Sequence, residues 1–238
     1  SVIEAARHAV YGLNKRPVLT WINAVDFEKN PEKVKELSKF DGIIVPGGFG
    51  IRGIEGIISA IKFAREHKIP YFGLCYGMQL ATIEFARNVC GLKGAHTTEV
   101  DAKTPHPIIT PMEEQQSLIQ EGHYGGSMRL GAYDCQLTPG SIAMRAYGKE
   151  KSGIGKNISI SERHRHRYEF NNKYRKELIE KGLVVAGFNP QRNLVEIIEL
   201  ADHPFFVGTQ FHPEFKSRPL SPHPLYLAFI RAATAHTK

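Results

Sequence analysis

The sequence has 238 residues, of which 42% are hydrophobic and 23% charged, a composition typical of one globular domain with a sizeable core. No apolar run is long enough to span a membrane, and the net charge of +7 is not interleaved with aromatic residues along one stripe. Neither a membrane nor a nucleic acid is therefore expected as a partner.

The N-terminal residues form a helix pattern over 2–10 that begins without a preceding Met. This opening leads us to expect one domain over residues 1–238 that is a piece of a longer protein. The three cysteines are odd in number and widely spaced, which argues against a disulfide framework. Their usage favours a reducing compartment, the cytoplasm.

Strand and helix patterns alternate along the first half of the chain. Buried strands are expected at the apolar runs 16–22, 41–46 and 69–73, and helices are expected after each of them. In this rhythm, right-handed crossovers join consecutive strands into a parallel sheet. The sequence therefore predicts an α/β fold with an open, largely parallel or mixed central sheet and helices on both faces.

A cysteine stands between two glycines where the third strand gives way to a helix. The pattern Gly73-Leu74-Cys75-Tyr76-Gly77 is the thiol counterpart of the Gly-x-Ser-x-Gly elbow, in which small residues make room for a strained backbone. The helix dipole and free N–H groups are expected to favour the thiolate of Cys75. The pattern predicts a nucleophile, and a buried structural cysteine is the alternative.

A glycine-rich loop, Pro46-Gly47-Gly48-Phe49-Gly50, follows the second strand. Ligands of such sheets bind beyond the carboxyl ends of the strands, where this loop and the elbow both lie. We expect the backbone N–H groups of Gly48 and Tyr76 to form an oxyanion hole. An ordinary glycine-rich turn is the alternative, and the loop lacks the Gly-Lys-Ser/Thr of a phosphate-binding loop.

The pattern loosens between about 91 and 156, where 125–131 is expected as a flexible loop with Arg129 at its tip. Residues 161–168 then alternate, which on a strand places arginines on one face and histidines on the other. No third ligand accompanies the two histidines, so no metal site is predicted. Binding of a carboxylate or phosphate by one arginine is favoured instead.

Three apolar runs lie near the C-terminus, at 183–188, 194–200 and 205–211. Because short connections join them, they predict a meander of antiparallel or mixed strands at a sheet edge. A final helix is expected at about 225–235. The last run leads into His212-Pro213-Glu214, where extended backbone directs His212 and Glu214 to the same side. The carboxylate can then orient the imidazole as the base of a cysteine nucleophile, and a structural histidine is the alternative.

The elbow, the donor loop and the His-x-Glu motif together resemble the class I glutamine amidotransferases of the Cys-His-Glu type, whose fold is flavodoxin-like. Three further stretches, at 50–56, 125–131 and 162–169, are similar to the CTP synthases, a family within that class. That family commonly has Leu at the position of Tyr76 and Lys at that of Ile57.

The resemblance implies that Cys75 attacks the side-chain amide of glutamine, that His212 moves the protons, and that Glu214 positions His212. The resemblance also implies which residues bind glutamine and its oxyanion: Gly48, Tyr76, Gln79, Glu99 and Arg167. Of these, Glu99 is implied to hold the amino group and Arg167 the α-carboxylate. Residues implied to face a synthetase domain or the activator GTP are Arg52, Glu55 and Arg129.

Partners follow from the same resemblance. In the CTP synthases this unit follows an N-terminal synthetase (amidoligase) domain, of which no part is evident here. That domain binds ATP, UTP and Mg²⁺, and ammonia released from L-glutamine aminates UTP to CTP. The unit itself is then expected to need no cofactor or metal, and a homo-oligomer, a tetramer, is expected to form only through the synthetase domain.

Two other functions fit part of the pattern. A cysteine hydrolase of similar fold, such as a DJ-1-like protein, shares an elbow cysteine but needs neither His212-Pro213-Glu214 nor the pair Glu99 and Arg167. A non-catalytic nucleotide-binding or regulatory module would use the basic segment 163–167. Mapping the adduct of a glutamine-analogue electrophile discriminates among the three.

Overall fold

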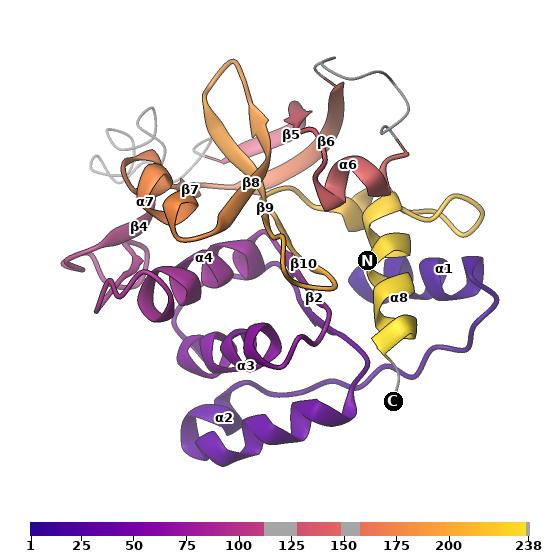
Figure 1. Ribbon diagram of the computed structural model, residues 1–238, viewed down its shortest axis with the longest axis horizontal. Helices are drawn as coiled ribbons and strands as arrows, with labels where there is room; N and C mark the ends of the chain where they lie inside the picture. The colour runs from indigo at the N-terminus through magenta and orange to yellow at the C-terminus, as the bar shows by residue number, and fades with distance from the viewer. Residues whose placement is uncertain (112–127, 149–157, 237–238) are drawn as a thin grey trace.

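The computed structural model describes residues 1–111, 128–148 and 158–236. A seven-stranded sheet runs through its centre in the order β1 (Ile43–Val45), β2 (Tyr71–Leu74), β10 (Phe206–Thr209), β9 (Leu194–Leu200), β8 (Leu183–Asn189), β5 (Arg129–Leu137) and β6 (Ile158–His166) (Figure 1). A three-stranded sheet lies beside it in the order β3 (His96–Thr97), β4 (Pro107–Pro111) and β7 (Tyr168–Phe170).

Helices cover both faces of the large sheet, and each face has its own hydrophobic core (Figure 1). The first core is built with α2 (Val25–Lys29), the 3₁₀ helix η1 (Pro31–Lys39), α3 (Ile54–Glu66), α4 (Tyr76–Asn88) and α7 (Arg175–Glu180), the last preceded by η3 (Asn172–Tyr174). The second core is built with α1 (Val2–Gly12), α6 (Ile142–Ala146) and α8 (Pro224–His236). Along β2, Tyr71 enters the first core and Phe72 the second, because successive side chains of a strand point to opposite faces.

The mixed α/β architecture with helices on both faces is confirmed. Parallel pairing joins β1 to β2 and β2 to β10, with α3 as the crossover between the first two strands. The remaining neighbours, β10 to β9, β9 to β8, β8 to β5 and β5 to β6, pair antiparallel. The sheet thus has a parallel half and an antiparallel half that meet at β10.

The strand expected at 16–22 is not formed. These residues have no regular secondary structure, and Val18 and Trp21 expose 88% and 73% of their surface. A strand is stable only where a neighbour pairs with it, and among the described residues β1 pairs with β2 alone. A cavity of about 1160 Å³ lies instead between this segment, β1 and α8.

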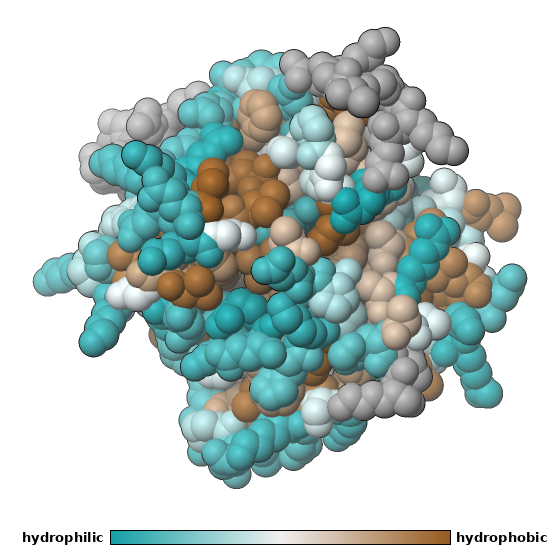
Figure 2. All heavy atoms as spheres, in the orientation of Figure 1, coloured by the Kyte–Doolittle hydropathy of each residue, from teal (hydrophilic) through white to brown (hydrophobic). Residues whose placement is uncertain are grey.

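The meander formed by β8, β9 and β10 is confirmed, but its expected position at a sheet edge is wrong. β10 inserts beside β2, and β5 and β6 extend the sheet beyond β8, so the three strands lie inside it. On the face shown in Figure 2, hydrophobic atoms gather over the β8 and β9 region while hydrophilic residues cover most of the remainder.

Two further predictions concern the last third of the chain. On β6, His164 and His166 are buried while Arg163 and Arg165 are exposed, so the predicted alternation is confirmed. The final helix is also confirmed, as α8. Within residues 1–111, 128–148 and 158–236, no helix combines the length and the apolar character that crossing a membrane requires.

Candidate active site

The elbow lies where β2 ends and α4 begins, with Cys75 between them at φ 49° and ψ −95°. A backbone in this region is strained for any residue with a side chain, and surrounding structure must enforce it. Gly77 and Gly73 make it fit: a Cβ on Gly77 would lie 2.4 Å from the carbonyl oxygen of Val45, and one on Gly73 would lie 2.7 Å from the carbonyl carbon of Gly77. The predicted role of both glycines is therefore confirmed.

The Cys75 thiol is buried, and this changes its expected protonation. Burial raises the pKa of the thiol to about 12, and the negative charges of Glu169 and Glu214 add to the rise. Hydrogen bonds from the Tyr76 backbone and from the Gln210 amide, 3.6 Å from Sγ, act in the opposite direction. The expectation of a resting thiolate is therefore wrong, because desolvation outweighs the helix N-terminus. A neighbouring base must take the proton when the sulfur attacks.

Such a base stands at the carboxyl end of β10. Nδ1–H of His212 donates a hydrogen bond of 2.7 Å to Oε1 of Glu214, and both side chains are buried. The 3₁₀ helix η4 (Pro213–Phe215) carries the carboxylate, and the Phe215 ring stacks on the imidazole at 4.8 Å. No described residue hydrogen-bonds Nε2 of His212. The ring is thus held on one side, and its second nitrogen is available for a reacting group.

Gly47 shows that the nucleophile and the base converge. A Cβ built on Gly47 would lie 2.8 Å from Cε1 of His212 and 3.7 Å from Cβ of Cys75. A side chain at position 47 would therefore clash with the imidazole and make ordinary contact with Cys75, so the base and the nucleophile both border Gly47. This meeting follows from the strand order β1, β2, β10, whose parallel carboxyl ends lie next to one another.

The donor loop continues from Gly47 across the top of the elbow. A Cβ on Gly48 would lie 3.4 Å from Cδ1 of Tyr76, so the phenol ring packs beside the loop. The Tyr76 hydroxyl donates a hydrogen bond of 2.5 Å to the carbonyl oxygen of Gly50. Phe49, between them, exposes 88% of its surface. The loop thus borders the nucleophile on one side and solvent on the other.

One of the expected glutamine-binding residues, Glu99, contacts this loop, and a second, Arg167, lies near Glu99. Glu99 is half-buried; burial raises the pKa of its carboxyl, while a hydrogen bond from the Gly50 backbone and the charge of Arg167 lower it. The charge of Glu99 in turn helps to raise the pKa of Tyr76, after burial. The Glu99 carboxylate therefore contacts the loop at Gly50, and Arg167 lies near enough to Glu99 for their charges to interact.

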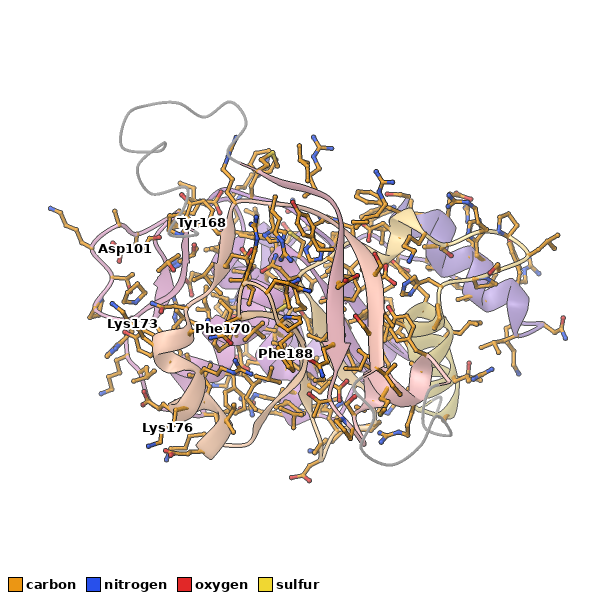
Figure 3. The ribbon with its side chains drawn as sticks, turned by 90° about the horizontal axis from the view of Figure 1, so that it is seen from above. Asp101, Tyr168, Phe170, Lys173, Lys176 and Phe188 are labelled. Carbon is orange, nitrogen blue, oxygen red and sulfur yellow. The ribbon has the colours of Figure 1, made fainter. Side chains whose placement is uncertain are left out.

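Gln79, the other expected residue, is buried in α4. Its amide nitrogen donates to the carbonyl oxygen of Tyr168 at 2.9 Å and lies 3.3 Å from Oε1 of Gln210. Figure 3 shows Tyr168 and Phe170 of β7 on the same side of the large sheet as the loop carrying Asp101. Gln79 thus ties the elbow helix to β7 rather than pointing a free amide at the site.

The three residues expected at an interdomain or GTP surface are placed differently from one another. Arg52 is exposed before α3, and Glu55 is exposed at the start of that helix, where it pairs with Arg87 at 2.8 Å. Arg129 begins β5, and its side chain is 0% exposed, so the expected cation at a loop tip is wrong. Its two buried carboxylate partners draw it inward. Residues 125–127 of the expected loop lie outside the described residues.

Sequence reasoning missed this buried ion cluster and the residue Gln210. Arg129 lies 2.7 Å from Glu196 and 3.6 Å from Glu169, with His164 and His166 beside the carboxylates at 3.7 and 3.3 Å. The inward-facing histidines of β6 were the available signal for the cluster. For Gln210, the signal was its position two residues before His212, within the apolar run 205–211 that leads to the base.

Metal ligation finds no support in this arrangement. Within the described part of the chain, no group of three or more His, Cys, Asp or Glu side chains is placed to hold a metal ion. The buried carboxylates instead pair with Arg129, a cation that already supplies positive charge.

Comparison with known proteins gives a consistent result. Residues 1–232 match the family model described as glutamine amidotransferase class-I. The chain is 56% identical to the CTP synthase of Caldanaerobacter subterraneus subsp. tengcongensis, over 98% of this chain and 41% of that protein. It is 55% identical to the CTP synthase of Carboxydothermus hydrogenoformans, over 100% of this chain and 42% of that protein.

A solved structure is similar as well. The Trypanosoma brucei CTPS glutaminase domain with bound acivicin superposes with a TM-score of 0.89 at 36% identity, covering 98% of this chain and 87% of that one. The chain spans about two fifths of the length of the curated relatives it matches.

Proposed function

Because the chain belongs to the class I glutamine amidotransferase family, we propose that it hydrolyses L-glutamine with Cys75, His212 and Glu214 as its catalytic residues. The observation that carries the proposal is the meeting of Cys75 and His212 at the backbone of Gly47. A buried thiol, a histidine with one free nitrogen and a carboxylate on the other nitrogen form the arrangement that cysteine-based acyl transfer needs.

The first half-reaction releases ammonia. Sγ of Cys75 attacks the side-chain carbonyl carbon of glutamine while its proton passes to Nε2 of His212. The negative charge on the carbonyl oxygen is stabilised by the N–H groups of Gly48 and Tyr76. The carbon–nitrogen bond then breaks, and the leaving nitrogen takes the proton from His212. A thioester on Cys75 and free ammonia result.

The second half-reaction restores the enzyme. His212 takes a proton from water, whose oxygen attacks the thioester carbon, and the carbon–sulfur bond breaks as Sγ regains a proton. Glutamate leaves. Glu214 holds the imidazole in the tautomer with its free nitrogen toward the sulfur. In this proposal Glu99 binds the substrate's amino group, Arg167 binds its α-carboxylate, and Gln79 keeps the elbow helix in place.

We further propose that the released ammonia serves amination of UTP to CTP in a longer protein. The similarity to CTP synthases over the whole chain supports this, as does the similarity to a CTPS glutaminase domain. In that protein a synthetase domain would bind ATP, UTP and Mg²⁺ and form the tetramer. Arg52 and Glu55 would face that domain and GTP. The free cysteines fit a cytoplasmic location.

The test is ammonia release from L-glutamine together with mapping of the adduct of 6-diazo-5-oxo-L-norleucine by mass spectrometry. Turnover is expected to be low for this chain alone, but the adduct should form on Cys75. Cys75→Ala should lower ammonia release by about 10⁴-fold or more. Cys90→Ala, a free cysteine away from the site, is the control. Labelling on another residue, or release that survives Cys75→Ala, would overturn the proposal.

A further inference from the structure

The loop at 47–50 must hold a donor N–H still although it lies at the surface. It has no regular secondary structure, Phe49 is exposed, and Gly50 has φ +82° with open space around its Cβ position. Glycine backbones of this kind have many accessible conformations. Stabilisation of an oxyanion requires the opposite, because a donor contributes most when it is already in place before charge develops. Something outside the loop must therefore restrain it.

The Tyr76 side chain contacts the loop at two points. Its ring packs 3.4 Å from the Cβ position of Gly48, and its hydroxyl donates to the carbonyl oxygen of Gly50 at 2.5 Å. The ring itself is buried, with 5% of the residue exposed. Because Tyr76 follows the nucleophile directly, its backbone is fixed by the elbow. One residue thus links the rigid start of α4 to Gly48 and Gly50, two of the three glycines in the loop.

Gly50 is also held from its other side. Its backbone N–H hydrogen-bonds the carboxylate of Glu99, while its carbonyl accepts from Tyr76. Both polar groups of that glycine are therefore engaged, one by a phenol and one by the carboxylate that faces Arg167. Burial and the nearby charge of Glu99 raise the pKa of Tyr76, so the phenol stays protonated and remains a donor.

We propose that the Tyr76 hydroxyl is a positioning residue for the donor loop: by anchoring Gly50 it holds the Gly48 N–H where the oxyanion develops. The inference rests on the proposed glutaminase function and adds a side-chain role to the residue after the nucleophile. Since the oxyanion forms only in the transition state, loss of the anchor lowers kcat more than it changes KM.

Two substitutions separate the ring from the hydroxyl. Tyr76→Phe keeps the ring beside Gly48 and removes the bond to Gly50, whereas Tyr76→Leu removes both contacts. We expect Tyr76→Phe to lower kcat for ammonia release by about 10-fold with KM within about threefold, since full removal of an oxyanion donor costs about 10²- to 10³-fold. Tyr76→Leu should lower kcat further. Tyr174→Phe, a tyrosine on η3 away from the elbow, should leave both constants unchanged.

Two readouts distinguish positioning from general damage. Backbone amides of 49–51 should exchange hydrogen faster in Tyr76→Phe, while amides of β2 and α4 keep the wild-type rate. Alkylation of Cys75 by iodoacetamide, which needs no oxyanion hole, should keep its wild-type rate. Unchanged kcat, unchanged exchange at 49–51, or slower alkylation of Cys75 would each overturn the loop role.

Failure of this inference is separable from failure of the proposed function. If Cys75→Ala abolishes ammonia release and Tyr76→Phe leaves kcat unchanged, the hydroxyl has no positioning role and the glutaminase proposal stands. If Cys75→Ala leaves release unchanged, the glutaminase proposal fails, and the role of Tyr76 fails with it.

Discussion

The parallel and antiparallel halves of the large sheet each bury a histidine against a carboxylate, but their surroundings differ. In the parallel half, His212 and Glu214 stand 2.7 Å apart, and no described residue hydrogen-bonds the second imidazole nitrogen. In the antiparallel half, Arg129 pairs with the same carboxylates that lie beside His164 and His166, and burial and the charge of Arg129 lower the pKa of both histidines.

The two sites differ in whether a cation stands beside the buried carboxylate. One guanidinium offsets only part of the charge of Glu169 and Glu196, and burial of all three side chains keeps the cluster away from solvent. The pair beside Cys75 is left without a cation, so its histidine can accept a proton and give it away. The same residue types thus perform different tasks because of a single neighbouring arginine.

In the parallel half, changing the carboxylate beside His212 should have a large effect on activity. Glu214→Gln keeps the shape of the side chain, but its neutral amide no longer holds the imidazole of His212 in the tautomer with Nε2 free. Ammonia release should therefore fall about 10³- to 10⁴-fold. Thermal unfolding should stay close to wild type. Glu180→Gln, an exposed residue of α7, is the matched control. A loss smaller than tenfold would remove Glu214 from the catalytic residues.

The next effect concerns the stability of the antiparallel half. Arg129→Met removes the cation and leaves Glu169 and Glu196 buried without it, which should lower the free energy of unfolding by about 3 to 5 kcal/mol. Urea denaturation measures this loss. Arg163→Met, which removes an exposed arginine from β6, should change stability by no more than about 0.5 kcal/mol. Equal losses in the two variants would contradict the structural role of the cluster.

The smallest effect is a dependence of stability on pH. Burial raises the pKa of Glu196 from 4.5 to about 7, so between these values the folded state holds a proton that the unfolded state has lost. Its contribution to stability is then present below about pH 4.5 and is lost as the pH rises to about 7. His164 and His166, whose pKa values are lowered, act in the opposite direction up to their ordinary range.

Glu196→Gln isolates the carboxylate from the histidines. The free energy of unfolding of the variant, relative to wild type, should increase from pH 4.5 to 7 and level off above it. Urea denaturation at several pH values gives this difference directly. A difference that stays constant over the window, or decreases, would show that Glu196 is ionised in the folded state.

Local rules predicted much of the parallel half from the sequence. The glycines of the elbow and of the donor loop indicate a close approach of backbones. The pairing of His212 with Glu214 is confirmed, but the 3₁₀ helix η4, and not the expected extended backbone, brings the two together. Each of these signals spans only a few residues. The architecture follows from the same kind of information, because strand and helix patterns alternate at short range.

The rest depends on contacts between distant segments. The partners of Arg129 come from β7 and β9, far along the chain, so its position in the sequence indicated a loop tip. The protonation of Cys75 depends on burial, which outweighs the helix N-terminus. Residues 16–22 have the composition of a strand, but pairing decides whether a strand forms, and β1 offers them none.

The unpaired edge of β1 has a consequence for self-association. Its three residues, Ile43, Ile44 and Val45, are apolar and carry no charge that would repel another strand. A free edge of this kind is a template for β-pairing between molecules, and proteins normally protect it with lysine, proline or a covering segment. Because β1 leads directly into the loop at Gly47, a strand that pairs with this edge would lie next to the donor loop.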